Sequence, residues 1–235
     1  MAEVVITLTV TLETPLSIGA GGSSGALADK TIVRDGWGRP FIPGSQVKGR
    51  ARHAAEALAR ALGLHVAELW QRRGESLSDP ACPIRAIFGG PTGWRDRSSA
   101  PARGDIAPLR FRDLRLRDDA PVREDTRGLR RSVIRPSVAI NRRRGTAEDQ
   151  RLLFQETTVE ALTFGNERAI AGTLAEERQL ALLVAALRMV DRWGGAKSRG
   201  LGWARVEVAA TWDGQAFAVT PDALDPLLRQ WEGVA

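Results

Sequence analysis

Apolar and polar residues alternate along parts of the chain with the period of β-strands. Residues 4–13 alternate isoleucine, leucine and valine with threonine and glutamate, which is the pattern of a strand that buries one face. Similar alternation or short apolar runs predict further strands at residues 31–33, 109–116, 159–164 and 203–212. In the strand predicted at residues 109–116, the apolar side chains change face near Arg112 and Asp113, which suggests a bulge.

A helical spacing of apolar residues predicts two long helices. The first follows the short strand Phe41-Ile42, which turns at Pro43-Gly44 directly into a helix that ends at Gly63. We expect Ser45 to cap the free amide groups at the start of this helix. The apolar stripe of the second helix covers residues 180–190.

Local signals place the ends of the second helix and the remaining elements. Thr173 and Glu176 form a predicted capping box before the helix, and Gly194-Gly195 follows it as a stop. Shorter helices are predicted at residues 66–72 and 221–231. Residues 74–104, rich in Pro, Gly and Ser, are predicted to be an irregular insertion.

Without its insertions the predicted order is strand, helix, strand, strand, helix, strand. This order is typical of an α+β fold with a ferredoxin-like or RRM-like (βαββαβ) core. We therefore expect one domain over residues 1–235, with an insertion at about residues 74–104. Such a sheet leaves one face for nucleic acid, although the aromatic signature of ordinary RRM modules is missing.

Composition and charge indicate a polyanionic partner. The 235 residues include 43% hydrophobic residues and carry a net charge of +6, and no run is apolar enough to cross a membrane, so we expect a cytoplasmic protein. A single cysteine with two histidines disfavours a structural zinc site.

Residues 122–151 hold nine arginines against four acidic residues. This segment is either a solvated charge run or a projecting hairpin, because Val138-Ala139-Ile140 is apolar and Gly145-Thr146 resembles a turn.

Two places carry candidate chemistry. A helix start with free amide groups, with Lys48 and Arg52 on one helix face, suits a phosphate; the plainer interpretation is an amphipathic helix with a solvated basic face. Asp29 follows the glycine-rich loop 19–25. Its carboxylate could orient or deprotonate a ribose 2′-hydroxyl or help to hold a divalent metal, whereas most loop aspartates only form turns.

Three motifs, taken in order, resemble the RAMP superfamily of CRISPR-associated proteins. They are Gly19-Ala20-Gly21-Gly22 before Asp29, the turn from Phe41 to Gly49, and the glycine-rich run from Gly194 to Gly202. Ile87-Phe88-Gly89 and Phe111-Arg112-Asp113 match further family motifs. The resemblance spans about residues 6–208. Within the superfamily, the chain looks like the repeated backbone subunit of type III effector complexes.

The resemblance implies a function and a set of site residues. The subunit would bind guide crRNA, cleave complementary target RNA with Asp29 and a divalent ion such as magnesium, and project a hairpin thumb at about residues 122–158. Its partners would be crRNA, target RNA, further copies of itself, a large polymerase-like subunit, a small subunit and capping RAMP subunits. The implied RNA-binding residues are Gly21, Gly22, Ser45, Gln46, Lys48, Arg50, Arg52, Arg135, Asn141, Arg142, Gly194, Gly195, Lys197, Ser198, Arg199 and Gly200.

Departures from the family pattern and alternative functions stay open. Gln46 replaces a usual hydroxyl residue, and Asn141 stands where an aspartate is common. Asp35, six residues after Asp29, matches a second family aspartate, but we interpret it as structural. The same chain could be a non-cleaving filament subunit that only holds guide RNA, or a precursor-processing nuclease that uses His53.

Overall fold

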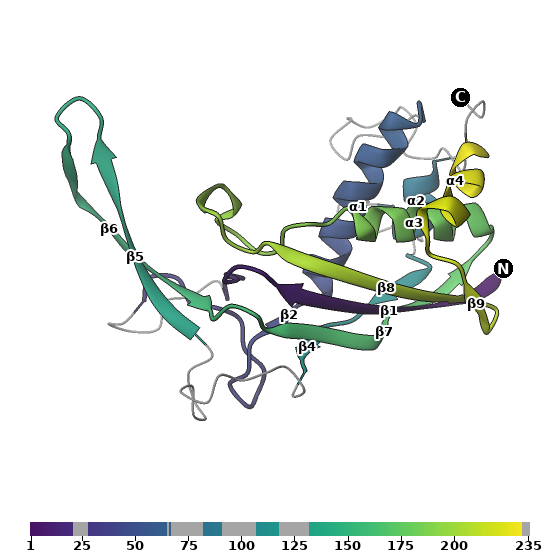
Figure 1. Ribbon diagram of the computed structural model, residues 1–235, viewed down its shortest axis with the longest axis horizontal. Coiled ribbons are helices and arrows are strands. Elements are labelled where there is room, and N and C mark those ends of the chain that lie inside the picture. The colour runs from purple at the N-terminus through teal and green to yellow at the C-terminus, as the bar shows by residue number, and fades with distance from the viewer. Residues whose placement is uncertain (21–27, 65, 67–81, 91–106, 118–131, 232–235) are drawn as a thin grey trace, which may run out of the picture.

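The computed structural model describes residues 1–20, 28–64, 66, 82–90, 107–117 and 132–231. A central antiparallel sheet organises this part of the chain (Figure 1). Strand β1 (Ala2–Leu12) lies in its middle and pairs with β7 (Thr163–Leu174) on one side and β8 (Ala204–Trp212) on the other. The outer strands are β2 (Phe41–Ile42), β3 (Leu109–Phe111), β4 (Leu114–Leu116) and β9 (Gln215–Phe217), which give the order β2-β4-β7-β1-β8-β9 with β3 also on β7.

Helices cover one face of the sheet and enclose the core. Helices α1 (Gly44–Ala61) and α3 (Glu177–Arg188) lie across that face, and α4 (Pro221–Arg229) packs beside α3 (Figure 1). The even-numbered apolar residues of β1 are buried, while its threonines are only half-buried, so β1 buries the face that its alternation predicts. The strands β1, β3/β4, β7 and β8 with α1 and α3 form the predicted ferredoxin-like βαββαβ core.

The structure confirms most predicted elements but shifts several boundaries. Residues 109–116 are two strands separated at Arg112 and Asp113, rather than one bulged strand. The segment predicted at 159–164 instead begins β7 at Thr163, and this strand continues to Leu174. The segment 31–33 makes only isolated β-bridges.

The predicted capping box and stop of the second long helix are wrong. The capping box consists of Glu176 and Gln179, because β7 continues through Thr173 and the helix starts only at Glu177. The helix ends at Arg188, so Gly194-Gly195 is not its stop.

The predicted irregular segment 74–104 contains a helix. Helix α2 (Pro83–Phe88) buries Ile84, Ile87 and Phe88 in the hydrophobic core. A proline at its first turn and Gly89 after it bound this helix. The predicted helix at 66–72 lies outside the described residues, except for Val66.

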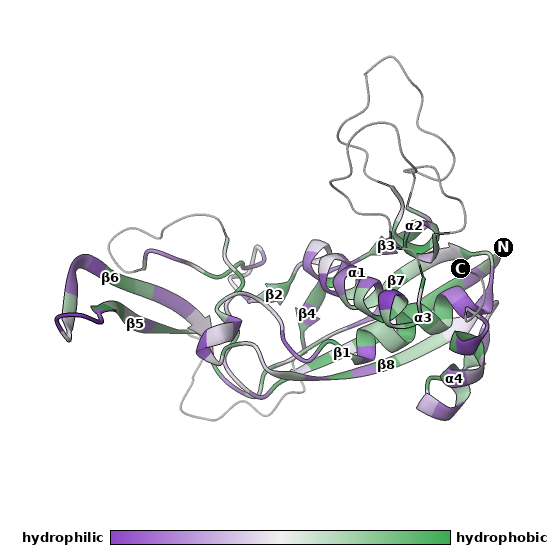
Figure 2. Cartoon of the chain, turned by 90° about the horizontal axis from the view of Figure 1, so that it is seen from above, coloured by the Kyte–Doolittle hydropathy of each residue, from purple (hydrophilic) through white to green (hydrophobic). Residues whose placement is uncertain are grey.

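The arginine-rich segment forms the predicted hairpin where the structure describes it. Strands β5 (Ser132–Asn141) and β6 (Thr146–Thr158) pair antiparallel in a separate two-stranded sheet and project from the body of the molecule (Figure 1). Hydrophobic positions are spread along both strands of this projection (Figure 2). No helix in the described part of the chain is long and apolar enough to cross a membrane.

Candidate nucleic-acid interface

The start of helix α1 is fixed by the Phe111-Arg112-Asp113 motif. The Asp113 carboxylate accepts a hydrogen bond from the Gly44 amide at 2.7 Å. A Cβ at Gly44 would lie 2.4 Å from the carbonyl oxygen of Phe111, so only glycine fits this contact. The prediction that Ser45 caps the helix is wrong: the N-cap residue is Pro43, and Ser45 is exposed at the first turn. A free phosphate would therefore compete with Asp113 for the Gly44 amide.

The basic residues of α1 divide into two groups. Lys48 lies 5.9 Å above the ring of Phe111, and its pKa is lowered by burial and by the positive charge of Arg52. Arg52 forms an ion pair with Glu56 at 2.8 Å. Arg50 is instead coupled electrostatically to Asp191 and Arg192, beyond the end of α3.

The glycine-rich run after α3 is a loop packed against the segment 15–17. The Gly195 amide donates to the Ser17 carbonyl at 2.7 Å, and the Gly202 amide donates to the Pro15 carbonyl at 2.9 Å. A Cβ at Gly202 would lie 1.9 Å from the carbonyl oxygen of Trp193. Close backbone packing accounts for Gly194 and Gly202, whereas a Cβ at Gly200 would meet nothing within 4 Å and this residue is at a φ of +80°. We call residues 194–202 the glycine loop.

The glycine loop and α1 bring three cations together, which we call the cationic cluster: Arg50, Arg192 and Lys197. Burial lowers the pKa of Lys197, and the charges of Arg50 and Arg192 lower it further, against the opposing charge of Asp191. Burial likewise lowers the pKa of Arg50. Within the described residues, the carboxylate that opposes these charges is Asp191, whose Oδ1 lies 3.6 Å from Nε of Arg192. Three cations beside this carboxylate leave excess positive charge that an anion would relieve.

Two polar atoms beside the cluster lack partners among the described residues. They are Oε1 of Gln46 and Nε of Arg50, both buried from solvent. Buried polar groups are normally hydrogen-bonded, so such orphaned atoms indicate a missing water or ligand. The cluster therefore has the charge of an anion site and, at Nε of Arg50, an unused donor for an anion. Oε1 of Gln46 is an acceptor and would bind a donor such as a hydroxyl group instead.

The structure thus unites some predicted site residues and leaves others apart. Arg50 lies at the cluster together with Lys197 of the glycine loop, and Gln46 lies one helical turn before Arg50 on α1. Ser198, Arg199 and Gly200 are exposed in the same loop. Gly21 and Gly22 lie outside the described residues. Arg192 was missed by the sequence analysis, and its only signal was a cation two residues before Gly194-Gly195.

Asp29 is attached to the base of the hairpin. Its amide donates to the Phe154 carbonyl at 2.9 Å, and its Oδ2 accepts from the Phe154 amide at 2.8 Å. The residue is nevertheless exposed. The Asp29 carboxylate therefore has a structural partner on β6 and remains open to a substrate.

Glu156 joins this loop to both strands of the hairpin. Its carboxylate accepts hydrogen bonds from the Ile32 amide at 3.0 Å, from Ser132 at 2.7 Å and from Arg34 at 2.5 Å. Burial raises the pKa of Glu156, but these hydrogen bonds and the charge of Arg34 outweigh it and hold the pKa below its ordinary value. The base of the hairpin is thus fixed by an ionised carboxylate.

The exposed surface of the hairpin is basic and apolar. Arg135 and Arg142 are exposed, as are the two arginines that follow Arg142. Asn141 accepts hydrogen bonds from the amides of Arg143 and Arg144 at 3.0 and 3.1 Å, so it shapes the turn that presents them. One face of the hairpin carries the exposed apolar side chains of Ile134, Val138, Leu152 and Phe154, which we call the apolar stripe.

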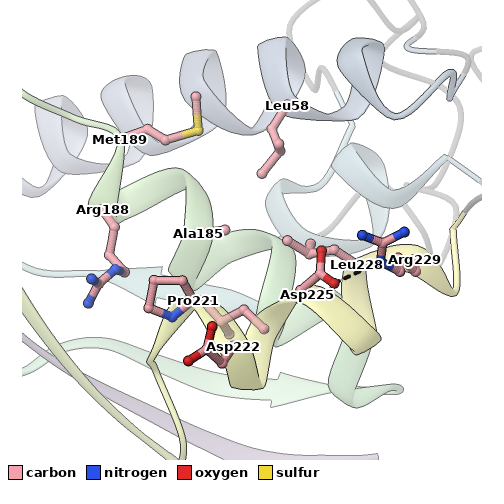
Figure 3. A pocket seen from close by; sticks show the side chains of 10 residues that line it. Leu58, Ala185, Arg188, Met189, Pro221, Asp222, Asp225, Leu228 and Arg229 are labelled. Carbon is pink, nitrogen blue, oxygen red and sulfur yellow. Dashed lines mark hydrogen bonds and ion pairs between the residues drawn. The ribbon is translucent and has the colours of Figure 1, made fainter.

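Two other candidate sites lie elsewhere. His53 is exposed on α1. A groove of about 750 Å³ lies between α1, α3 and α4, with Leu58, Ala185 and Met189 on one side and the Asp225–Arg229 ion pair on the other (Figure 3). Its described lining includes no predicted RNA-binding residue.

The described residues contain no group of three or more His, Cys, Asp or Glu side chains that could hold a metal ion. The divalent ion implied by the resemblance therefore has no fitting donor set in this part of the chain.

Comparison with known families identifies the chain. The model of the RAMP superfamily matches residues 9–205, from β1 into β8. The chain belongs to the RAMP superfamily. Membership implies a CRISPR-associated, RNA-binding function with RNA and CRISPR-complex partners. No curated protein matched this RAMP chain.

Proposed function

We propose that this RAMP protein is the repeated backbone subunit of a type III CRISPR ribonucleoprotein, which binds guide crRNA and cleaves complementary target RNA. The observation that carries the proposal is the cationic cluster formed by Arg50, Arg192 and Lys197 between α1 and the glycine loop. Cations and amide groups recognise phosphates, which are identical at every position of a strand. Guide RNA of any sequence would bind in this way.

The hairpin supplies the second part of the proposal. Its apolar stripe has no core to enter, although apolar side chains gain about 25 cal/mol for each Å² removed from water. In the proposed complex the hairpin inserts against the guide–target duplex and reaches the neighbouring copy of the chain. The large polymerase-like subunit, the small subunit and the capping RAMP subunits complete the assembly.

Asp29 is the proposed catalytic residue. Its carboxylate accepts the proton of a target ribose 2′-hydroxyl, and the 2′-oxygen attacks the adjacent phosphorus. The bond from phosphorus to the 5′-oxygen breaks, which leaves a 2′,3′-cyclic phosphate, and the departing 5′-oxygen takes a proton from water. Displacement of a target base by the hairpin would allow the 2′-oxygen to align for this attack.

One observation favours a second candidate function, a filament subunit that holds guide RNA without cutting the target. The Asp29 carboxylate already accepts a hydrogen bond from the Phe154 amide, and this structural task is sufficient to explain an aspartate at this position. The two functions make different predictions for isosteric replacement of Asp29.

The deciding experiment compares Asp29→Asn with Asp29→Ala in the assembled complex, with complementary RNA and a divalent ion. Asparagine retains an oxygen that can accept from the Phe154 amide, but it cannot take a proton. If Asp29 is catalytic, both variants lose about a hundredfold or more in cleavage rate, while binding of the target stays the same. Asp213→Asn is the matched control, because the exposed Asp213 at the turn between β8 and β9 likewise accepts a backbone amide, that of Glu3 at 2.7 Å.

Cleavage by Asp29→Asn at the rate of the unaltered complex would show that Asp29 acts only through its hydrogen bond. Absence of cleavage even by the unaltered complex would favour the filament function.

A further inference from the structure

Trp37 is the most exposed tryptophan of the described chain. Its relative exposure is 75%, against 37% for Trp203, while Trp193 and Trp231 are buried. An indole is the largest apolar side chain, and aromatic groups of this kind are enriched where a protein binds a partner. The packing of the described residues therefore does not explain why this large apolar side chain is exposed.

The turn that carries Trp37 is rigid. Oδ1 of Asp35 accepts hydrogen bonds from the amides of Trp37 and Arg39 at 3.0 and 2.9 Å, and Oδ2 accepts from Nε of Arg39 at 3.0 Å. The Gly38 amide donates to the Asp35 carbonyl at 2.9 Å. Burial raises the pKa of Asp35, but the hydrogen bonds from Arg39 and Trp37 lower it below its ordinary value. A group held in this way loses little conformational entropy on binding.

The same turn is tied to the base of the hairpin. Nη1 of Arg34 donates to the Gly38 carbonyl at 2.7 Å, and Nη2 donates to Ser132 and to Glu156. Asp29, in the same short segment, bonds β6 two residues before Glu156. The backbone that carries the indole is therefore held relative to the loop and the hairpin to which the proposed function assigns RNA.

The surroundings of Trp37 favour a single flat ligand. The Arg39 guanidinium carbon lies 5.2 Å from the centre of the indole ring, and no other large apolar side chain is exposed in the described residues 28–43. A stable protein interface buries about 800 Å² on each partner, which one ring cannot supply. One nucleobase covers one ring, and a neighbouring guanidinium suits the phosphate attached to it.

We propose that Trp37, with Arg39 over one face of its ring, is a stacking platform that binds one base of a single-stranded RNA on the other face. The proposal rests on the RNA-binding function proposed above and adds a contact to a base, which the phosphate contacts of the cationic cluster do not provide. Stacking tolerates every base, so the platform contributes affinity without fixing the sequence.

The test uses the full chain, freed of nucleic acid at high salt, with single-stranded RNA that contains 2-aminopurine. A matched strand of equal length lacks bases. We expect Trp37→Ala to weaken binding of the normal strand about tenfold or more and to relieve the quenching of 2-aminopurine. Binding of the abasic strand and the slope of affinity against salt stay unchanged, because no phosphate contact is lost.

Two control variants separate stacking from other effects. Trp37→Phe retains a ring and most of the affinity, and Met189→Ala removes another exposed apolar side chain without effect. Equal affinities for Trp37→Ala and the unaltered chain would overturn the proposal, as would an equal loss on the abasic strand. So would unchanged RNA affinity combined with weaker self-association, which would assign Trp37 to a protein contact.

Failure of the proposed function gives a different result. In that case the unaltered chain shows no salt-dependent RNA binding, and Lys197→Glu changes nothing. That result would overturn both proposals, whereas a defect confined to Trp37→Ala supports the platform.

Discussion

Two glycines of α1 show how strongly single residues are constrained near the candidate interface. Gly44 lies against the Phe111 carbonyl, whereas a Cβ at Gly49 would meet nothing within 4 Å. We expect Gly44→Ala to destabilise the protein by about 1–3 kcal/mol through overpacking. Gly49→Ala, in the interior of the same helix, should stabilise it by about 0.5–1 kcal/mol. Thermal unfolding of the two variants checks this, and equal shifts would contradict the contact at Gly44.

Glu156 gives a residue-scale prediction about pH. Because its pKa is lowered in the folded state, its contribution to stability is present above the unfolded pKa of about 4.3 and is lost as the pH falls through the folded value. We expect Glu156→Gln to cost about 1–2 kcal/mol at pH 7, since the carboxylate binds three donors but is partly open to water.

Unfolding measured between pH 3 and pH 7 tests this prediction. The unaltered chain and Glu156→Gln should approach each other in stability towards the acidic end. A constant difference over the whole range would show that ionisation of Glu156 does not stabilise the hairpin base. Glu148→Gln, on the exposed part of the hairpin, is the matched control.

At the scale of elements, the hairpin should tolerate polar substitutions that the sheet does not. Val138 and Leu152 are opposite each other in the apolar stripe and are 44% and 57% exposed. Their joint replacement by serine should change the stability of the isolated chain by less than about 0.5 kcal/mol for each site. Under the proposed function it should weaken assembly on guide–target duplex.

Sedimentation of the complex with RNA and thermal unfolding of the free chain measure these two effects separately. Ile170→Ser, at a buried position of β7, is the contrasting variant and should destabilise the free chain itself. Strong destabilisation by the hairpin variant would mean that the stripe packs inside the chain.

The elements that sequence predicted well are those with a strong local pattern. β1, α1, α3 and β8 each show a clear hydrophobic period, so their existence follows from local chemistry. The hairpin was one of two alternatives, supported by an apolar triplet and by Gly145-Thr146 as a turn. The division at Arg112-Asp113 could not be predicted, because Asp113 leaves the strand to cap a helix 69 residues away in sequence. The capping box was misplaced because pairing with β1 extends β7 beyond Thr173, and tertiary pairing overrides a local signal.

The candidate site was predictable in its parts but not in its grouping. Spacing indicated a basic helix, and the glycine run was visible in the sequence. The side chain of Arg50 lies near Lys197 and Arg192 and not on the helix face of Lys48 and Arg52. This grouping depends on how α1 crosses the sheet. Long-range packing of this kind has no counterpart in the local pattern.

At the scale of the whole molecule, RNA binding should depend strongly on salt and little on sequence. Each phosphate contact on a single strand contributes about 0.7 to the slope of log affinity against log salt. Lys197→Glu should therefore lower both the affinity and the slope, through loss of one contact and repulsion of the phosphate. Arg60→Glu, at the far end of α1 with a side chain 54% exposed, is the matched control.

Affinities for two unrelated RNA sequences, each measured over a range of salt concentrations, complete this test. Unequal loss on the two sequences would indicate that Lys197 contacts bases. An unchanged slope would remove the cationic cluster from the RNA interface.

The hydrogen bonds of Ser17 connect movement of the hairpin to movement of the glycine loop. The Ser17 carbonyl accepts the Gly195 amide at 2.7 Å, while its hydroxyl donates to the Glu156 carbonyl at 3.1 Å and accepts from Gln155 at 2.8 Å. One buried residue is thus shared by the glycine loop and the hairpin. In the proposed complex, a neighbouring subunit that bends the hairpin must either break these bonds or move the glycine loop with it. RNA binding at the glycine loop of one copy and binding of the next copy at its hairpin would then be thermodynamically linked. By reciprocity, each binding event would strengthen the other to the same degree.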